Sequence, residues 1–199
     1  MFWSLGFMWN IKNEAFLKDI EWLTNAQIKL STGTSGNSEI PYYDHLALVA
    51  GDANYNDEAG IYPKQSGNEE LSWEQTWANN IGLTLGFFNR VNLNVDFYHK
   101  KTTNMLMLVP QSYAITGVGN RWDNIGAMMN RGVEIAMDGD VIRTKDFTWN
   151  LSANVSYNKN KLLELYNGVE EYVNSTTGLK YVVGHPVHEY YMNLSLIHI

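Results

Sequence analysis

One stretch of the chain combines acidic and aromatic side chains in a way that suits binding of a polar, uncharged ligand. Between residues 34 and 74 there are eight acidic residues and one basic residue, Lys64, and this excess of seven negative charges equals the net charge of −7 of the entire chain. Aromatic rings can stack on sugar rings, and carboxylates accept hydrogen bonds from hydroxyl groups. The stretch is therefore a candidate contact surface for a polyhydroxylated ligand.

Seven residues of this stretch are the ligand or partner contacts that we predict from the sequence: Tyr42, Tyr43, Asp44, Tyr55, Asp57, Tyr62 and Trp73. A surface loop that packs its own tyrosines, or that meets neighbouring loops, would have the same composition. Contact with a partner protein is a third interpretation of the same residues. The sequence leaves these three interpretations open.

Catalytic and metal motifs elsewhere in the chain are incomplete. His185 and His188 are three residues apart and could share a metal, but the sequence shows neither a third ligand nor a helical setting for them. Cysteine is absent, which excludes disulfides, thiolate metal sites and a cysteine nucleophile. No Ser-His-Asp set or spaced pair of carboxylates stands out, so the sequence predicts no enzymatic activity and no cofactor.

A calcium loop is suggested by the residues that follow Asp52, but the pattern fails. Asp57 stands where an EF-hand loop requires glycine, and Pro63 stands where it requires a bidentate glutamate. A calcium site of another kind, built from Asp52, Asp57 and Glu58, remains open at this point.

Composition limits the class of protein. The chain has 199 residues, a length for one domain or for part of a larger one. Its longest unbroken apolar runs, 46–50 and 105–109, are far shorter than the ~20 residues of a membrane-spanning helix, whereas the half-apolar strands of a membrane β-barrel remain possible. No basic patch is present that would hold a phosphate backbone, so the sequence predicts no nucleic-acid partner.

Strict alternation of apolar and polar residues predicts β-strands that would carry these loops. In residues 147–158, every odd position is apolar or aromatic and every even position is Thr, Asn or Ser, which is the pattern of a strand with two unlike faces. Similar alternation predicts five more strands, at 3–11, 25–32, 76–87, 91–98 and 132–138. Strands of about ten residues, tilted by roughly 45°, span about 25 Å, the apolar height of a transmembrane barrel. A soluble β-sandwich with one wet face would also alternate.

The predicted connections differ in length at the two ends of the strands. Residues 88–90 and 143–146 form tight turns, and residues 13–23 are predicted to form a short helical turn on the same side. The connections at 34–73 and 105–130 are long. Short turns on the periplasmic side and long loops outside are typical of outer-membrane barrels.

An ordered set of short motifs resembles the barrel of SusC/RagA-type TonB-dependent outer-membrane receptors over residues 1–193. The motifs are Phe16-Leu17-Lys18-Asp19, Trp22-Leu23, residues 29–37, Leu71-Ser72-Trp73-Glu74, Asn80-Ile81-Gly82-Leu83, Arg90, Asp96-Phe97-Tyr98, Lys101-Thr102, Asn124-Ile125-Gly126, Asn130-Arg131-Gly132-Val133-Glu134, Trp149-Asn150 and residues 157–161. Two departures are local: Thr32 replaces a usual aromatic residue, and Glu69 stands where proline is frequent.

The resemblance implies an all-β fold, an antiparallel meander that forms about six strands of a 22-stranded transmembrane barrel. It also implies a transporter in the outer membrane, surrounded by lipid, that imports oligosaccharides or peptides together with a SusD-like lipoprotein. The TonB complex would act through an N-terminal part that this sequence lacks. Six strands are fewer than the eight of the smallest closed barrels, which predicts a fragment. Residues 194–199 leave the family pattern and are predicted to be a non-native tail. The alternative from the strand pattern is a soluble β-sandwich that binds carbohydrate.

Overall fold

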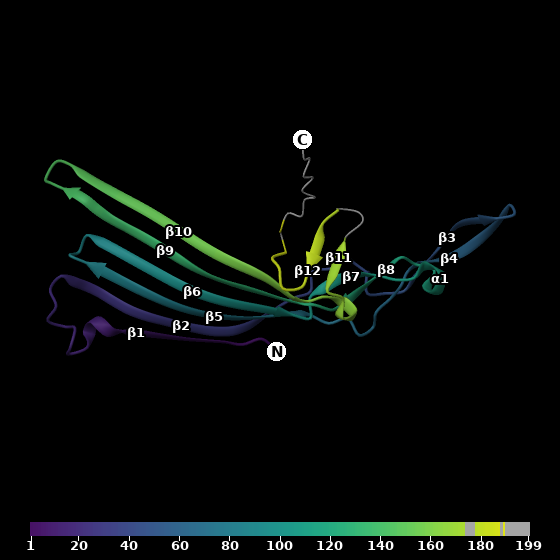
Figure 1. Cartoon of the computed structure of the whole chain (residues 1–199), viewed down its shortest axis with the longest axis horizontal. Helices are drawn as coiled ribbons and strands as arrows, with labels where there is room; N and C mark the ends of the chain where they lie inside the picture. Colours follow the sequence, from purple (N-terminus) through teal and green to yellow (C-terminus); the bar gives the residue numbers. More distant parts are fainter. Residues whose placement is uncertain (174–177, 188, 190–199) are drawn as a thin grey trace, which may run out of the picture. The chain divides into compact units, whose positions relative to one another are not determined.

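The computed structural model describes residues 1–173, 178–187 and 189. Six long strands lie side by side in one sheet, in the order β1-β2-β5-β6-β9-β10 (Figure 1). Their bounds are β1 (Ser4–Asn10), β2 (Leu23–Asn37), β5 (Glu74–Phe87), β6 (Val91–Thr103), β9 (Ala127–Arg143) and β10 (Thr148–Glu164). All six predicted strands are confirmed, and the antiparallel meander is confirmed as the fold class. The sheet is open and not closed into a barrel.

The chain divides into two compact units. Residues 1–35, 76–101 and 129–160 form the first unit, which contains most of the six-stranded sheet. The rest of the described chain forms the second unit, which contains most of both long connections.

The two long connections contain secondary structure that the sequence did not predict. Strands β3 (Leu48–Tyr55) and β4 (Glu58–Gln65) form a hairpin within the first connection. Strands β7 (Leu106–Pro110) and β8 (Asn120–Asn124) pair in the second, on either side of the single-turn helix α1 (Tyr113–Thr116). Further on, β11 (Glu171–Val173) pairs with β12 (Lys180–Val182) after the 3-10 turn η2 (Tyr166–Gly168). No helix among the described residues is long and apolar enough to cross a membrane.

The sequence did not predict the β3–β4 hairpin because the pairing of its strands is irregular. The register shifts between Leu48 and Val49 and again between Ala50 and Ala53, so apolar and polar residues do not alternate along the strand. The tight turn at Asn56 and Asp57 has positive φ at both residues, 54° and 66°. Asparagine and aspartate are the residues other than glycine that tolerate this conformation best.

The connection between β1 and β2 was predicted as a helical turn over 13–23, and this prediction is only partly right. The structure has a 3-10 turn, η1 (Ile11–Asn13), followed by separate turns, one of which is closed by the helix-type hydrogen bond from the Lys18 amide to the Glu14 carbonyl oxygen, at 2.9 Å. Leu23 already belongs to β2. The ammonium group of Lys12 donates hydrogen bonds to the carbonyl oxygens of Leu17, Lys18 and Ile20, at 2.9, 3.0 and 2.8 Å. These carbonyl groups converge on one cation, which a continuous helix would not allow.

The six-stranded sheet has one apolar face and one polar face. Seven apolar side chains on the first face are between 41% and 68% exposed: Leu5, Phe7, Ile81, Phe97, Ile135, Leu151 and Val155. A β-sandwich would divide the strands between two sheets and bury these side chains in between, whereas here all six strands form one sheet. An apolar face of this extent requires an apolar environment.

Candidate functional site

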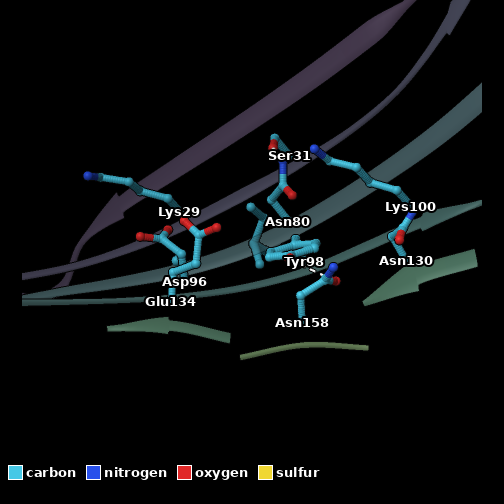
Figure 2. A pocket seen from close by; sticks show the side chains of 11 residues that line it. Lys29, Ser31, Asn80, Asp96, Tyr98, Lys100, Asn130, Glu134 and Asn158 are labelled. Carbon is cyan, nitrogen blue, oxygen red and sulfur yellow. Dashed lines mark hydrogen bonds between the residues drawn. The ribbon is translucent and has the colours of Figure 1, made fainter. Parts of the chain in front are cut away.

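The polar face of the sheet is hollowed in its middle. The hollow has a volume of about 590 Å³ and is lined from five strands, β2, β5, β6, β9 and β10 (Figure 2). Its charged residues are Lys29, Asp96, Lys100 and Glu134. Its amide and hydroxyl groups come from Ser31, Asn80, Tyr98, Asn130 and Asn158.

Tyr98 crosses a neighbouring strand within this hollow. Its phenol oxygen donates a hydrogen bond of 3.1 Å to Oδ1 of Asn158, so that a side chain of β6 reaches β10 (Figure 2). Gly132 on the intervening strand β9 makes room for the ring, because a Cβ atom there would lie 2.5 Å from the phenol oxygen and 2.7 Å from the ring carbon Cζ. The Tyr98 ring therefore occupies the space that a side chain at position 132 would need.

Gly82 likewise leaves room for the side chain of Asp96. A Cβ atom on Gly82 would lie 2.5 Å from the carboxylate oxygen Oδ1 of Asp96 and 3.5 Å from Cβ of Lys29. The side chains of Lys29, Asp96, Lys100 and Glu134 are exposed. The arrangement offers hydrogen bonds and charges of both signs to a polar solute or to another polar surface.

The seven residues predicted from the acidic stretch lie in three places in the second unit. Tyr42 and Tyr43 lie in one turn, with Tyr42 94% exposed. Asp44 in the same turn accepts a hydrogen bond of 2.7 Å from the indole nitrogen of Trp122 on β8. Gln65 at the end of β4 donates to the backbone oxygens of Tyr43 and Leu46, at 2.8 Å each. The Asp44 carboxylate thus links this turn to the second long connection.

Three of the other predicted residues lie on the β3–β4 hairpin, and Trp73 lies outside it. Tyr55 is the last residue of β3, Asp57 lies in the tight turn, and Trp73 is exposed immediately before β5. On β4, hydrogen bonding of the phenol to the Asp52 carboxylate, together with the negative charge of Asp52, raises the pKa of Tyr62.

A groove of about 520 Å³ in the same unit was missed by the sequence analysis. It is lined by residues that include His45, Pro63, Gln65, Glu69 and Val118, and none of the seven predicted residues lines it. Aromatic residues guided the prediction, while the groove is built from an imidazole, amide, carboxyl and small apolar groups. Glu69, which departs from the family pattern, would have been the signal.

Within the part of the chain that the structure describes, the candidate metal ligands do not come together. Among the described residues, no three His, Cys, Asp or Glu side chains are placed to hold a metal ion, and this includes Asp52, Asp57 and Glu58. The imidazole Nδ1 of His185 lies 2.8 Å from a carboxylate oxygen of Glu189. His188 lies outside the described residues, as does the predicted tail 194–199.

The Asp52–Tyr62 contact gives a pH-dependent prediction. Replacing Asp52 by asparagine should lower the pKa of Tyr62 toward the ordinary tyrosine value of about 10, because the negative charge that disfavours the phenolate is removed. Since the folded pKa is raised, the contact stabilises the hairpin below the unfolded pKa and is lost as the pH rises through the folded pKa. A difference titration of phenolate absorbance, D52N against wild type, measures this, and identical curves would contradict the contact.

Known proteins match this chain along a stretch that includes all six strands of the sheet. The family model for the β-barrel of TonB-dependent receptor-like proteins matches residues 1–194. The chain belongs to this family. It is 38% identical over 158 residues to the TonB-dependent receptor P39 of Formosa agariphila, and 34% identical over 177 residues to the TonB-dependent receptor SusC of Bacteroides thetaiotaomicron. These matches cover 79% and 83% of this chain.

A solved structure shows the same fold. The structure of the RagAB peptide transporter superposes with a TM-score of 0.85 at 38% identity, over 93% of this chain and 20% of the matched chain. The chain spans 15% and 17% of the lengths of P39 and SusC. It is thus a SusC/RagA-type TonB-dependent receptor segment of the outer membrane, and its relatives are receptors and transporters. The family assignment and the single sheet replace the soluble β-sandwich as the interpretation.

Proposed function

We propose that this segment forms part of the barrel wall of an outer-membrane importer of oligosaccharides or peptides. The observation that carries the proposal is the single sheet with an exposed apolar face for lipid and a polar, hollowed face for the lumen. In this arrangement the hollow on the polar face is in contact with the transport path or with the part of the receptor that closes it.

The two ligand classes rest on different observations. Exposed Tyr42, Tyr43 and Trp73 in a surplus of carboxylates suit the stacking and hydrogen bonding of an oligosaccharide. The likeness to the RagAB peptide transporter favours a peptide. A SusD-like lipoprotein on the long connections, and coupling to the TonB complex through a part of the receptor outside these 199 residues, complete the proposal.

The proposal is tested by uptake in cells that depend on a complete receptor carrying this segment. Cells are grown on an oligosaccharide mixture or on an oligopeptide mixture as sole carbon source. Cells that lack the receptor should fail to grow on one of the two mixtures, and the intact gene should restore growth on it. Tyr42→Ala should reduce uptake at an unchanged receptor level, while Ile61→Ala, a matched change at an exposed apolar side chain of β4, should not. Equal growth with and without the receptor on both mixtures would overturn the proposal.

The orientation of the sheet gives a separate prediction. A small tag inserted at Gly60, near the tip of the β3–β4 hairpin, should react with a membrane-impermeant label on intact cells, because the long connections face outward in this arrangement. A tag between Thr144 and Phe147 at the β9–β10 turn is the control, and it should react only after the outer membrane is ruptured. The opposite result would reverse the topology.

A further inference from the structure

The outward faces of three adjacent strands, β6, β9 and β10, carry basic side chains and no acidic ones. Lys100, Asn130 and Asn158 line the hollow on the polar face. Successive side chains of a strand point to opposite faces, so the next residue along each strand points outward: Lys101, Arg131 and Lys159.

The register of β9 with β10 places Arg131 and Lys159 opposite each other. The side chains of Asn150 and Asp140 are hydrogen-bonded at 3.2 Å, and those of Asn160 and Asn130 at 2.9 Å. Both pairs fit one antiparallel register of β9 with β10, in which Arg131 lies opposite Lys159.

This row of residues continues onto β6. The amide of Asp140 donates to the carbonyl of Arg90 at 2.9 Å, and Tyr98 lies over Gly132 further along the two strands. Both contacts fit a register in which His99 lies opposite Arg131. The outward row is therefore His99, Arg131 and Lys159, with Lys101 two residues beyond His99; we call these four residues the basic row.

The basic row has no counter-charge within the described chain. Lys101, Arg131 and Lys159 are exposed, and none of them forms an ion pair with a described residue. The acidic residues that these strands contribute to the first unit lie on the opposite face: Asp96, Glu134, Asp138 and Asp140. Like charges directly opposite each other on a sheet destabilise the pairing, so an anion between Arg131 and Lys159 would stabilise it.

The position of the basic row along the strands indicates which class of anion lies beside it in a membrane. One step toward the short turns, the outward residues are Phe97, Val133 and Tyr157, and the two aromatic side chains are exposed. Aromatic residues mark the level at which hydrocarbon gives way to headgroups. The basic row follows immediately, on the side of the long connections, so it lies at the level of the headgroups.

We propose that the basic row binds the phosphate groups of a phosphorylated glycolipid in the outer leaflet of the outer membrane. Arginine offers a planar pair of N–H donors to phosphate oxygens, and lysine adds a compact charge beside it. The choice of leaflet rests on the proposed function, in which the long connections lie on the cell exterior. The row thus fixes the height of the wall in the bilayer and selects the lipid beside it.

The test measures lipid bound to a purified, delipidated complete receptor that carries this segment. Lipid A, enzymatically dephosphorylated lipid A and phosphatidylglycerol are titrated separately, with bound lipid counted by native mass spectrometry. Wild type should bind lipid A more tightly than the other two. Arg131→Gln with Lys159→Gln should weaken lipid A binding by roughly tenfold or more, since each basic residue contributes to attraction of an anionic headgroup.

Matched variants separate this row from general charge. Lys29→Gln with Lys100→Gln removes the same charge from the polar face and should leave lipid A binding unchanged, and Lys159→Arg should retain it. Equal binding by the R131Q/K159Q receptor, or equal binding of dephosphorylated lipid A to wild type, would overturn the proposal. Equally tight binding of phosphatidylglycerol would overturn the assignment to the outer-leaflet glycolipid. Uptake and the Gly60 tag test the proposed function independently, because lipid binding in detergent requires no transport.

Discussion

Replacing Gly132 by alanine should sharply reduce the amount of folded receptor in the outer membrane. A Cβ atom there would collide with the backbone oxygen of Tyr157 and with the phenol of Tyr98, which lies across the glycine to reach Asn158. The carbonyl cannot move without disturbing the pairing of β9 with β10. Overpacking of this kind costs about 1–3 kcal/mol. Heat-modifiable gel mobility of outer-membrane fractions measures the folded share.

Gly6 provides the matched control for this prediction. It also lies in a strand of the six-stranded sheet, but no atom would be within 4 Å of a Cβ at this position. Gly6→Ala should therefore leave the folded share unchanged. Tyr98→Ala combined with Gly132→Ala should recover only part of the loss, because the collision with the Tyr157 carbonyl remains. A G132A receptor that folds as well as wild type would show that Tyr98 does not lie across β9 in the assembled barrel.

Replacing Leu151 by arginine should be far more damaging than the same change at its neighbour Ser152. Leu151 is the fourth residue of β10, two residues after Trp149 on the apolar face, and is 48% exposed, so in the membrane it meets hydrocarbon. An arginine facing lipid costs about 2–4 kcal/mol at the midplane and about 0–1 kcal/mol near the interfaces, and the cost at Leu151 lies between these limits. Ser152 lies on the polar face, where its hydroxyl contacts Oδ1 of Asn150 at 3.4 Å, and a longer polar side chain can extend into the wet lumen.

Urea titration of both variants in lipid vesicles measures this difference as a shift in the unfolding midpoint. L151R should unfold at clearly lower urea than S152R, and both should be compared with wild type in the same lipid. If S152R is the less stable receptor, the assignment of the two faces of the sheet is wrong.

The long strands were predictable because each has two unlike environments. In β10 every odd residue from Trp149 to Tyr157 is apolar, and the structure places these residues on one exposed face. The prediction of strand ends was poorer: β2 and β9 run for 15 and 17 residues, well beyond the alternating stretch. Outside the apolar band both faces of a strand are wet, so hydrophobicity no longer marks which residues are paired.

The site was harder to predict because its geometry depends on contacts between distant residues. Nothing local to Gly132 indicates that Tyr98 lies across it, and nothing local to Asp44 indicates its bond to Trp122. Thr32, which stands where the family usually has an aromatic residue, accepts a hydrogen bond from the Trp77 indole at 3.0 Å and donates one to Asn79 at 2.8 Å. Such pairs become visible only when the register of the strands is known. The seven predicted contact residues remain a prediction.

The order of the strands has a consequence for how the wall is assembled. Each strand of the sheet pairs with the nearest preceding one, and the residues between β2 and β5 and between β6 and β9 contain two-stranded sheets closed on themselves. Strands therefore pair in chain order, and because each long connection contains its own two-stranded sheet, little further entropy is lost when the strands on either side of it pair. The wall can grow one hairpin at a time during insertion. For the same reason, an outer hairpin can change length or sequence between relatives without shifting any strand beside it, so ligand preference can diverge while the wall stays constant.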